Sequence, residues 1–575
     1  MDVYRQFFVD KVSRTFADTL AAFGLARVLA DLLERQEPSR GDVLITDRGS
    51  YFQLTCSPPL EHATVETLAV ARISPIPAIR TEKNAASLPE DIPALDYAAD
   101  RERVNLYYAA RKAGAENLPP LPSYWEIERA INPGALSGYN RMVVDWWRLE
   151  ALQSAALELL LALHSATPND YAAALEGWKQ LGAPKDIKAE TTCLQLYNPD
   201  QGKGQNKSKA DGLSIGNIPN FWLVEWLKAV GFYEAALTRT VRGAKDRKTF
   251  VLAPRELALS TSGAVMSDFR ASMSAETSTK FDILAALRYT QRLLEHAQRE
   301  ESLVLRLLRR QSPKHIVAGF DTAFYKDLGN AAATMNMSFI ALPGWVQVTS
   351  RDDLNVYTDP DRGVLTELEK VARQFDESHS DAFTLLQHLR DFISGDDLAA
   401  FFRFTNAFAG YYISQREQNR YAYPLSTEFI ERLIMSTEKP LSRILETPGF
   451  QNIAYAIRQS TVTAQYRKKQ GDRKYDVRYG LGQELARKAR YPEAFIAALS
   501  DFLHKYNAEN AQVMETRPKP YRRSVKTSDI DDIIWLIDEY GSETVANLLI
   551  AYGYARVPRD EDESTEQAEN QEETA

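Results

Sequence analysis

The sequence predicts an α+β protein, in which a mixed N-terminal α/β body with β-hairpins and long loops precedes an all-α C-terminal helical bundle. Two stretches, residues 42–56 and 236–254, alternate apolar and polar side chains around a short polar turn, which is typical of β-hairpins. From about residue 325 onward, almost every segment instead repeats apolar residues at three- and four-residue steps. A chain of 575 residues is long enough for three or four domains.

The N-terminal half is expected to mix helices with these hairpins. Residues 1–36 repeat large apolar side chains at helical spacing, so we expect an amphipathic helix there. Four prolines between residues 73 and 99 predict an irregular excursion or a strand edge. Further helices are expected at about 100–116 and 136–165.

The expected division of the chain follows from these patterns and from the composition of its C-terminal end. Four parts are predicted: an N-terminal body over residues 1–325, a helical connector over 326–434, a helical bundle over 435–556 and an acidic tail over 557–575. The tail is expected to be disordered, because its last sixteen residues hold eight acidic side chains and no basic one.

The composition limits which class of protein this chain can belong to and in which cellular compartment it is expected. No apolar run reaches the roughly 18 residues that a membrane span needs, so we expect no membrane association. The first residues include an acid and lack the pattern of a signal peptide. Cys56 and Cys193 are too few for a disulfide framework or a zinc site. A cytoplasmic location is therefore the default expectation.

The net charge of −9 argues against a nucleic-acid partner, but the charge is segregated along the chain. Residues 458–526 contain 16 Lys and Arg against 7 Asp and Glu. Residues 200–248 contain 9 basic against 5 acidic side chains. Such basic segments in an acidic protein indicate nucleic-acid-binding surfaces.

A polar loop, residues 198–212, lies between apolar flanks and carries amides and lysines on a glycine-rich backbone. Lysines suit phosphates, and amides suit base edges because they both donate and accept hydrogen bonds. A solvated connector has the same composition and is the alternative. The candidate DNA-binding residues of this loop are Gln201, Lys203, Gln205, Asn206, Lys207 and Lys209. Of these, Gln205 and Asn206 are the candidates for base edges.

The second hairpin is expected to present a basic tip. Its turn, residues 243–248, contributes Lys245, Arg247 and Lys248 as candidate phosphate contacts. A solvated turn is the alternative.

Tyrosines alternate with basic residues in the C-terminal segment 451–526. This pattern suits a surface that follows a single nucleic-acid strand, with bases stacked on aromatic rings. A well-solvated helical face is the alternative. The candidate strand contacts are Arg467, Lys468, Lys469, Arg473, Lys474, Arg478, Arg522 and Arg523.

The sequence lacks the short motifs of the common catalytic sites. None of its seven histidines is followed by an aspartate, and no phosphate-binding loop, nucleophile elbow, HExxH or paired CxxC occurs. We therefore expect a binding subunit that has no catalytic residues, metal or cofactor. Two alternatives stay open: a nucleic-acid-processing enzyme whose carboxylates converge only in space, and a structural adaptor with basic faces for acidic proteins.

Several phrases resemble the large subunit of type I CRISPR effector complexes (Cascade), most like the type I-B/I-A branch. They are GLSIGNIPNFWLVEWLKAVGFYEAALTR at 212–239, RYGLGQELARKA at 478–489, DFLHKYNAENAQV at 501–513 and GSETVANLLIAYGYAR at 541–556. The expected order of an α/β body and a helical bundle that is similar to the complex's small subunit also matches this family.

The resemblance implies a non-catalytic subunit that recognises the protospacer-adjacent motif (PAM) in target duplex DNA, promotes R-loop formation and holds the non-target strand. The implied partners are the crRNA, the backbone and cap subunits, the small subunits and a helicase-nuclease. Target sequence is then read by base pairing, and the protein reads only the short motif.

One further hypothesis concerns Met435, which lies where the helical bundle is expected to begin. Several complexes of this family obtain their small subunit by internal translation of the large-subunit gene. Met435 could therefore start a separate product, residues 435–575, although an ordinary buried methionine is the alternative.

Overall fold

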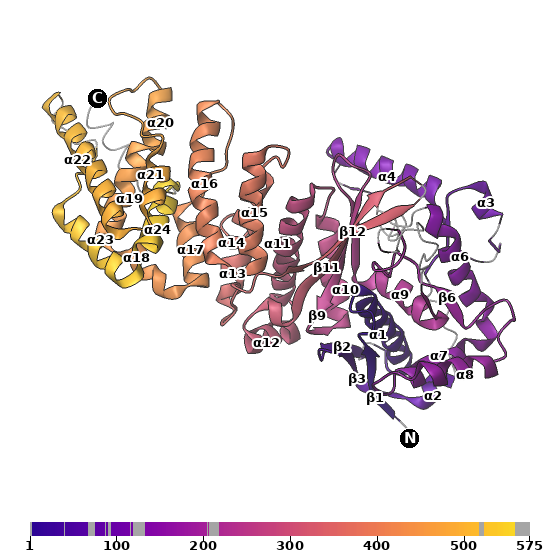
Figure 1. Ribbon diagram of the computed structural model, residues 1–575. Helices are drawn as coiled ribbons and strands as arrows, with labels where there is room; N and C mark the ends of the chain where they lie inside the picture. Colours follow the sequence, from indigo (N-terminus) through magenta and orange to yellow (C-terminus); the bar gives the residue numbers. More distant parts are fainter. Residues whose placement is uncertain are drawn as a thin grey trace, which may run out of the picture. The chain divides into compact units, whose positions relative to one another are not determined.

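The computed structural model (Figure 1) divides the chain into two units, of which the first contains the sheets and the second is built from helices. Unit 1 comprises Met1–Phe281 and Arg288–Leu342, and unit 2 comprises Asp282–Leu287 and Pro343–Ala575. The structure describes residues 3–38, 41–66, 75–86, 88–89, 92, 94–115, 117–118, 133–203, 205, 218–329, 331–516 and 522–557. The predicted α+β class is confirmed.

Unit 1 holds two four-stranded antiparallel sheets, in the orders β1-β3-β2-β10 and β12-β11-β9-β8. Two smaller sheets pair β4 with β5 and β6 with β7. The strands are β1 (Val3–Asp10), β2 (Asp42–Asp47), β3 (Tyr51–Glu61), β4 (Ala78–Ile79), β5 (Leu95–Asp96), β6 (Glu190–Thr192), β7 (Pro219–Phe221), β8 (Ala236–Thr240), β9 (Arg247–Pro254), β10 (Glu256–Ala258), β11 (Val317–Asp327) and β12 (Ala332–Ala341). Both predicted hairpins, β2–β3 and β8–β9, are confirmed.

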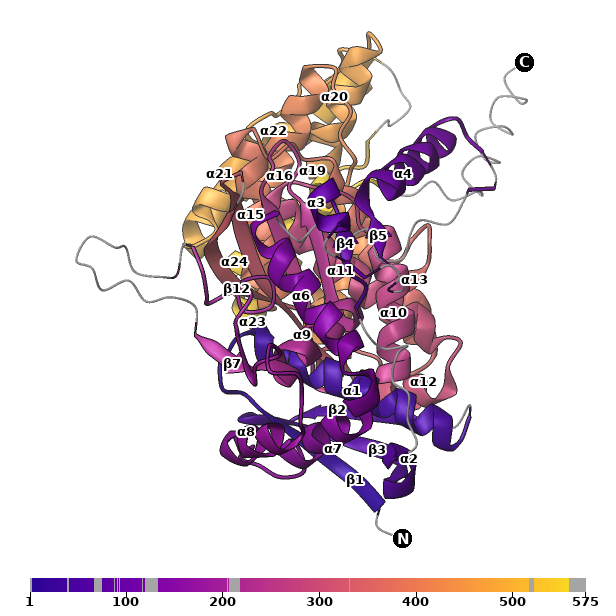
Figure 2. The same ribbon diagram turned by 90° about the vertical axis from the view of Figure 1, so that its right-hand side faces the viewer.

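The helices of unit 1 pack on these sheets and on one another (Figure 2). They are α1 (Phe16–Gln36), α2 (His62–Glu66), α3 (Glu82–Ala85), α4 (Tyr97–Lys112), α6 (Pro133–Arg148), α7 (Gln153–Leu163), α8 (Tyr171–Gln180), α9 (Trp222–Ala235), α10 (Leu259–Ser272) and α12 (Glu301–Arg310). Helix α11 (Ser278–Ala297) is shared, because its residues Asp282–Leu287 belong to unit 2. Gly24 of α1 and Gly231 of α9 allow these two helices to touch, because a Cβ at Gly24 would lie 2.0 Å from the carbonyl oxygen of Leu227.

The expected N-terminal helix over residues 1–36 is wrong for its first part, which forms β1. Phe7 and Val9 are buried at alternate positions, as a strand requires, whereas Val12 is 71% exposed. The helix α1 begins only at Phe16, after Thr15 accepts a hydrogen bond from the Ala17 N–H as its N-cap. Apolar spacing alone therefore predicted a helix that begins well before the first residue of α1.

The expected start of the helical connector at residue 326 is also wrong. Residues 326–327 end β11, and β12 extends to Ala341 in an antiparallel pair with it. The long segment of unit 2 begins at Pro343. The segment reads Ala-Ala-Thr-Met-Asn-Met, a composition that helices tolerate, so pairing with β11 overrides its local preference.

Unit 2 follows the predicted helices closely. Its helices are α13 (Asp352–Thr358), α14 (Val364–Arg373), α15 (Ser380–Gly395), α16 (Leu398–Glu417), α17 (Thr427–Thr437), α18 (Ser442–Glu446), α19 (Pro448–Ser460), α20 (Val462–Lys469), α21 (Leu481–Lys488), α22 (Pro492–Thr516), α23 (Thr527–Tyr540) and α24 (Ser542–Tyr554). Helix α16 packs against α21 and α24. One packed unit therefore extends on both sides of Met435, which lies inside α17 and is 48% exposed.

Across the part of the chain that the structure describes, none of the helices combines the length and apolar composition that a membrane-spanning helix requires. The acidic tail from residue 558 onward lies outside the described residues.

Candidate nucleic-acid interface

The polar loop is described only at its stem. Gln201, Lys203 and Gln205 belong to the described residues, whereas Asn206, Lys207 and Lys209 lie outside them. The sequence also predicts a β-like run over residues 192–197 before the loop, and this expectation is wrong, because β6 ends at Thr192 and residues 193–197 form no strand.

Hydrogen bonds hold the stem of this loop to neighbouring structure. The Gln201 side-chain oxygen accepts from the Ile218 N–H at 3.0 Å, which closes the base of the loop. Thr334 of the edge strand β12 donates its N–H to the Lys203 carbonyl at 2.9 Å and accepts from the Gln205 amide at 3.4 Å. The Gln201 side chain is therefore engaged in a hydrogen bond within the protein, while the side chains of Lys203 and Gln205 are exposed.

A buried polar cluster, which the sequence did not reveal, anchors the loop to α9. Glu225 and Lys228 form an ion pair at 2.5 Å and are both almost fully buried. Asn198 donates to Glu225 at 2.9 Å and accepts from Lys228 at 2.7 Å. Burial raises the pKa of the neighbouring Cys193 thiol to about 12. A buried ion pair is tolerated when its remaining hydrogen-bonding groups have partners. Because Asn198 bonds to both members of the pair, the cluster holds the first residue of the polar loop against α9.

The basic tip of the second hairpin is smaller than predicted. Lys245 lies in the exposed turn, but Arg247 and Lys248 belong to strand β9. Lys248 is 5% exposed and its ammonium lies 5.6 Å from the Phe250 ring centroid. Burial lowers the pKa of Arg247. Only Lys245 is therefore placed as an exposed phosphate contact would need.

In unit 2, several predicted strand contacts are occupied by intramolecular bonds. The Lys468 ammonium donates to the Tyr479 hydroxyl at 2.9 Å, and Lys474 pairs with Asp472 at 3.7 Å. Lys469 donates to the Arg416 carbonyl and to Asn419, so it caps the end of helix α16. Arg467 is half-buried and Arg473 is exposed.

Arg522 and Arg478 converge on one carboxylate. The Arg522 side chain is fully buried, with its guanidinium 3.4 Å from the Tyr475 ring centroid and 3.7 Å from Glu509. Arg478 also pairs with Glu509. The prediction that Arg522 contacts a strand is therefore wrong, because its side chain is enclosed within the bundle.

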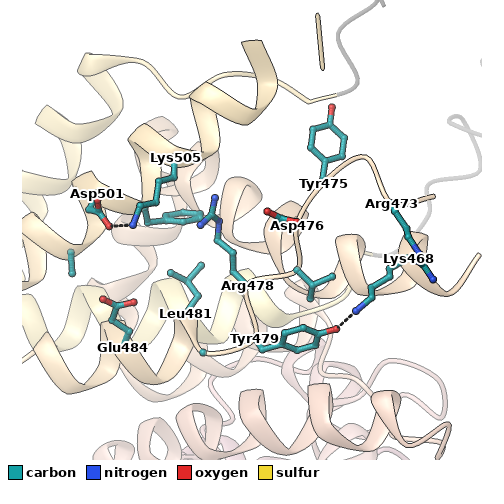
Figure 3. Close-up of a pocket in the computed structure, with 14 residues that line it drawn as sticks. Lys468, Arg473, Tyr475, Asp476, Arg478, Tyr479, Leu481, Glu484, Asp501 and Lys505 are labelled. Atoms are coloured by element: carbon teal, nitrogen blue, oxygen red, sulfur yellow. Dashed lines mark hydrogen bonds and ion pairs between the residues drawn. The ribbon is translucent and has the colours of Figure 1, made fainter. Parts of the chain in front are cut away.

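Arg478 also lines a pocket of about 640 Å³ beside α21 and α22 (Figure 3). We call it the ion-pair pocket, because acids and bases alternate around it. Its charged lining residues are Lys468, Arg473, Arg478 and Lys505 with Asp476, Glu484 and Asp501. Lys505 and Asp501 pair at 2.6 Å. Three of the predicted strand contacts thus surround a nearly neutral pocket.

A second hollow, of about 1000 Å³, has a different lining. We call it the arginine–tyrosine groove. Its charged and aromatic lining residues are Arg416, Arg420, Arg458, Arg523 and Arg556 with Tyr412, Tyr421, Tyr455 and Tyr466, and no Asp or Glu is among the described residues that line it. Tyr421 is 82% exposed and Tyr466 is 48% exposed. A hollow lined by charge of one sign concentrates the electrostatic potential.

The groove is assembled from helices that neighbour one another in unit 2 (Figure 1). Tyr412 and Arg416 are four residues apart on α16 and therefore lie on one face. A second face continues from α19 into α20, and its groove residues are Tyr455, Arg458, Gln459, Val462, Thr463 and Tyr466. Arg523 comes from the segment before α23, with its guanidinium 4.2 Å from the Tyr455 ring centroid.

Two arginines tie the C-terminal end of the described chain to this groove. Arg458 donates to the carbonyls of Tyr552 and Ala555, which helix α24 leaves without helical partners. Burial lowers the pKa of Arg458 to about 10, so it stays charged at neutral pH. The Arg556 backbone is bonded to Leu425 at 2.8 Å and to Thr427 at 2.9 Å.

Of the residues predicted from the sequence, only Arg523 lies in this groove. Arg458 and Tyr466 belong to the segment 451–526 in which tyrosines alternate with basic residues, but they were not among the candidate strand contacts. Arg416, Arg420 and Arg556 were missed because they fall outside the basic segment 458–526. Their shared signal is a Tyr or Arg at helical spacing in α16 and α19, which ordinary core helices also show.

No cluster of three or more His, Cys, Asp or Glu that could hold a metal ion occurs within the described ranges. In the comparisons with known proteins, no protein-family model and no curated protein matches the chain.

Proposed function

We propose that the chain is a nucleic-acid-binding subunit that holds a single strand in the arginine–tyrosine groove. The observation that carries this proposal is the lining of the groove, where five arginines and four tyrosines come together without a carboxylate among its described residues. Guanidinium groups bind phosphates through paired hydrogen bonds. Aromatic rings stack on bases of any sequence.

The geometry favours a single strand over a duplex. The exposed rings of Tyr421 and Tyr466 can stack only on bases whose faces are uncovered, and a duplex covers them by stacking its own base pairs. Arg416 lies 5.7 Å from the Tyr466 ring centroid, so one hollow offers a cation and a stacking surface side by side. Neighbouring phosphate and base groups of one strand would meet these two side chains together.

We further propose that the protein is the non-catalytic large subunit of a crRNA-guided DNA surveillance complex of type I. In this role it recognises the PAM through the polar loop of unit 1, promotes R-loop formation and holds the non-target strand in the groove. Its partners are the crRNA, the backbone, cap and small subunits, and the helicase-nuclease. The quoted sequence phrases support this identity, as does the order of a sheet-containing unit and a helical unit.

Equilibrium binding of the full chain tests the groove function. We expect an oligothymidine strand to bind more tightly than a duplex of equal length, with an affinity that falls as salt rises. Equal affinity for both, or binding that is independent of salt, would contradict the proposal.

Purification of the tagged chain from its own cells tests the complex. We expect it to co-purify with a short RNA that derives from a CRISPR repeat array, which sequencing of the bound RNA would identify. Absence of such RNA from a preparation that still binds oligothymidine would overturn the complex identity and leave the groove function standing.

A single variant tests the polar loop separately. Asn206→Ala is expected to weaken binding of the assembled complex to PAM-bearing duplex without changing guide assembly. Asn105→Ala, at an exposed position of α4, is the matched control in unit 1 and should leave duplex binding unchanged. If Asn206→Ala leaves duplex binding unchanged in a gel shift, the loop is not the PAM reader.

A further inference from the structure

The groove is also the place where the described chain ends. Val557 is the last described residue and lines the groove together with Arg556. Because the Arg556 backbone is bonded to Leu425 and Thr427, this exit point is fixed relative to α17. Every residue that follows therefore starts from the edge of the groove.

The sequence that follows is complementary in charge to the groove. Asp560–Ala575 contains eight carboxylates and no basic side chain, and its first four residues are all acidic. Asp560 is three positions beyond Val557, after Pro558 and Arg559, and an extended chain covers roughly 10 Å over three positions. The first carboxylates are thus within reach of the nearest guanidinium groups of the groove.

The cations on the opposite wall are available for such a ligand. Arg416 contacts the hydroxyl and ring of Tyr412, and Arg420 lies in the exposed segment after α16. Neither is seen in an ion pair within the described residues, although Arg420 also lines a neighbouring hollow that contains Asp376 and Asp381. An arginine beside an aromatic ring and outside any ion pair gains from a carboxylate that arrives from elsewhere.

We propose that the acidic segment Asp560–Ala575 docks in the arginine–tyrosine groove of its own chain and competes there with nucleic acid. A short tether gives a docking segment an effective concentration in the millimolar range, so even weak carboxylate–guanidinium contacts populate the docked state. Competition with nucleic acid rests on the proposed function, whereas the docking itself does not.

The docking is tested first without nucleic acid. The probe is a fluorescent synthetic peptide of residues 558–575, which is titrated at low ionic strength with a chain truncated after Val557. We expect binding that weakens roughly tenfold or more in the triple variant Arg416→Ala, Arg420→Ala and Arg556→Ala. The triple variant Arg487→Ala, Lys488→Ala and Arg490→Ala removes the same charge from α21 and the turn that follows it, outside the groove, and should bind as the parent does.

Two peptide results would overturn the docking. One is the absence of binding to the truncated chain, and the other is an equal loss of affinity in both triple variants. A peptide whose eight acids are changed to amides controls for peptide length and should not bind. Since all three arginines of the groove variant line an open hollow, circular dichroism should show both triple variants folded.

The competition is tested in the full chain with the same eight substitutions, Asp560→Asn, Glu561→Gln, Asp562→Asn, Glu563→Gln, Glu566→Gln, Glu569→Gln, Glu572→Gln and Glu573→Gln. We expect oligothymidine to bind this chain about three- to tenfold more tightly than the parent, with a difference that disappears at high salt. Equal affinities would overturn the competition even if oligothymidine binds. Peptide docking without any oligothymidine binding would instead overturn the proposed function and leave the docking intact.

Discussion

Two hollows in unit 2 have similar numbers of basic side chains but differ in net charge, since one is nearly neutral and the other is positive. The ion-pair pocket places Lys468, Arg473, Arg478 and Lys505 among three acids, whereas the arginine–tyrosine groove has five arginines and no acid among its described lining. A phosphate that enters the pocket meets three carboxylates as well as four basic side chains, so its net attraction is small. Pairing within the fold, more than the density of basic residues in the sequence, therefore decides which hollow can attract an anion.

The largest expected effect on stability compares two adjacent arginines: Arg522, whose side chain is buried, and Arg523, which lines the groove. Arg522→Ala should lower the free energy of unfolding by about 3–5 kcal/mol, because it leaves the half-buried Glu509 with one arginine fewer and empties the face of Tyr475. Arg523→Ala, its matched control in the groove, should change stability by less than about 0.5 kcal/mol. Urea denaturation measures both, and equal stabilities would contradict the enclosed position of Arg522.

The next largest effect compares the two hollows directly. The triple variant Arg416→Ala, Arg420→Ala and Arg556→Ala should weaken oligothymidine binding on the order of a hundredfold at low salt, and lower the salt slope by about 2. In the ion-pair pocket, the triple variant Lys468→Ala, Arg473→Ala and Lys505→Ala should change the affinity no more than roughly threefold. Fluorescence anisotropy over a salt series checks both, and the reverse ranking would assign the strand to the ion-pair pocket.

A smaller effect separates stacking from charge. Tyr421→Ala and Tyr466→Ala should each weaken oligothymidine binding by about 1–3 kcal/mol and leave the salt slope unchanged, because they remove a stacking surface and no charge. Tyr421→Phe and Tyr466→Phe should restore most of the affinity, since phenylalanine keeps the ring. Weak binding by the phenylalanine variants would indicate that the hydroxyl groups carry the contact.

The smallest expected effect comes from a variant that makes the ion-pair pocket resemble the arginine–tyrosine groove in charge. The variant Asp476→Asn, Glu484→Gln and Asp501→Asn removes the acids of the ion-pair pocket without changing its size. We expect oligothymidine binding to strengthen about threefold, because the pocket bases then act on a phosphate without opposing charge. An unchanged affinity would mean that the shape of the groove matters more than its lack of acids.

The helical unit could be predicted from the sequence with little error, because its apolar residues repeat at helical spacing over long segments. The first residues and β12 could not, since Val3–Asp10 and Ala332–Ala341 become strands only through pairing with distant partners. The candidate site was harder still. Counting charges found the basic segment but could not show that Arg522 is enclosed or that Arg478 is paired.

The groove escaped prediction for a related reason. Its members come from α16, α19 and α20, from the segment before α23 and from the end of α24, and only folding brings them together. The linear sequence places Arg416 and Arg556 far apart, and each alone is an ordinary surface arginine. The buried pair of Glu225 and Lys228 was missed in the same way, because burial of an ion pair has no signature in spacing.

The position of Met435 inside α17 divides the groove between two possible gene products. A product that starts at Met435 would keep Tyr455, Arg458, Arg523 and Arg556, but it would lack the wall formed by Arg416, Arg420 and Tyr421. Mass spectrometry of the purified complex would detect such a product. If several copies of it stood beside one full chain, only the full chain would offer a complete groove. Under the proposed function, a strand would then bind strongly at the full chain and weakly at each shorter product, so the ratio of the two products would set how tightly the strand is held.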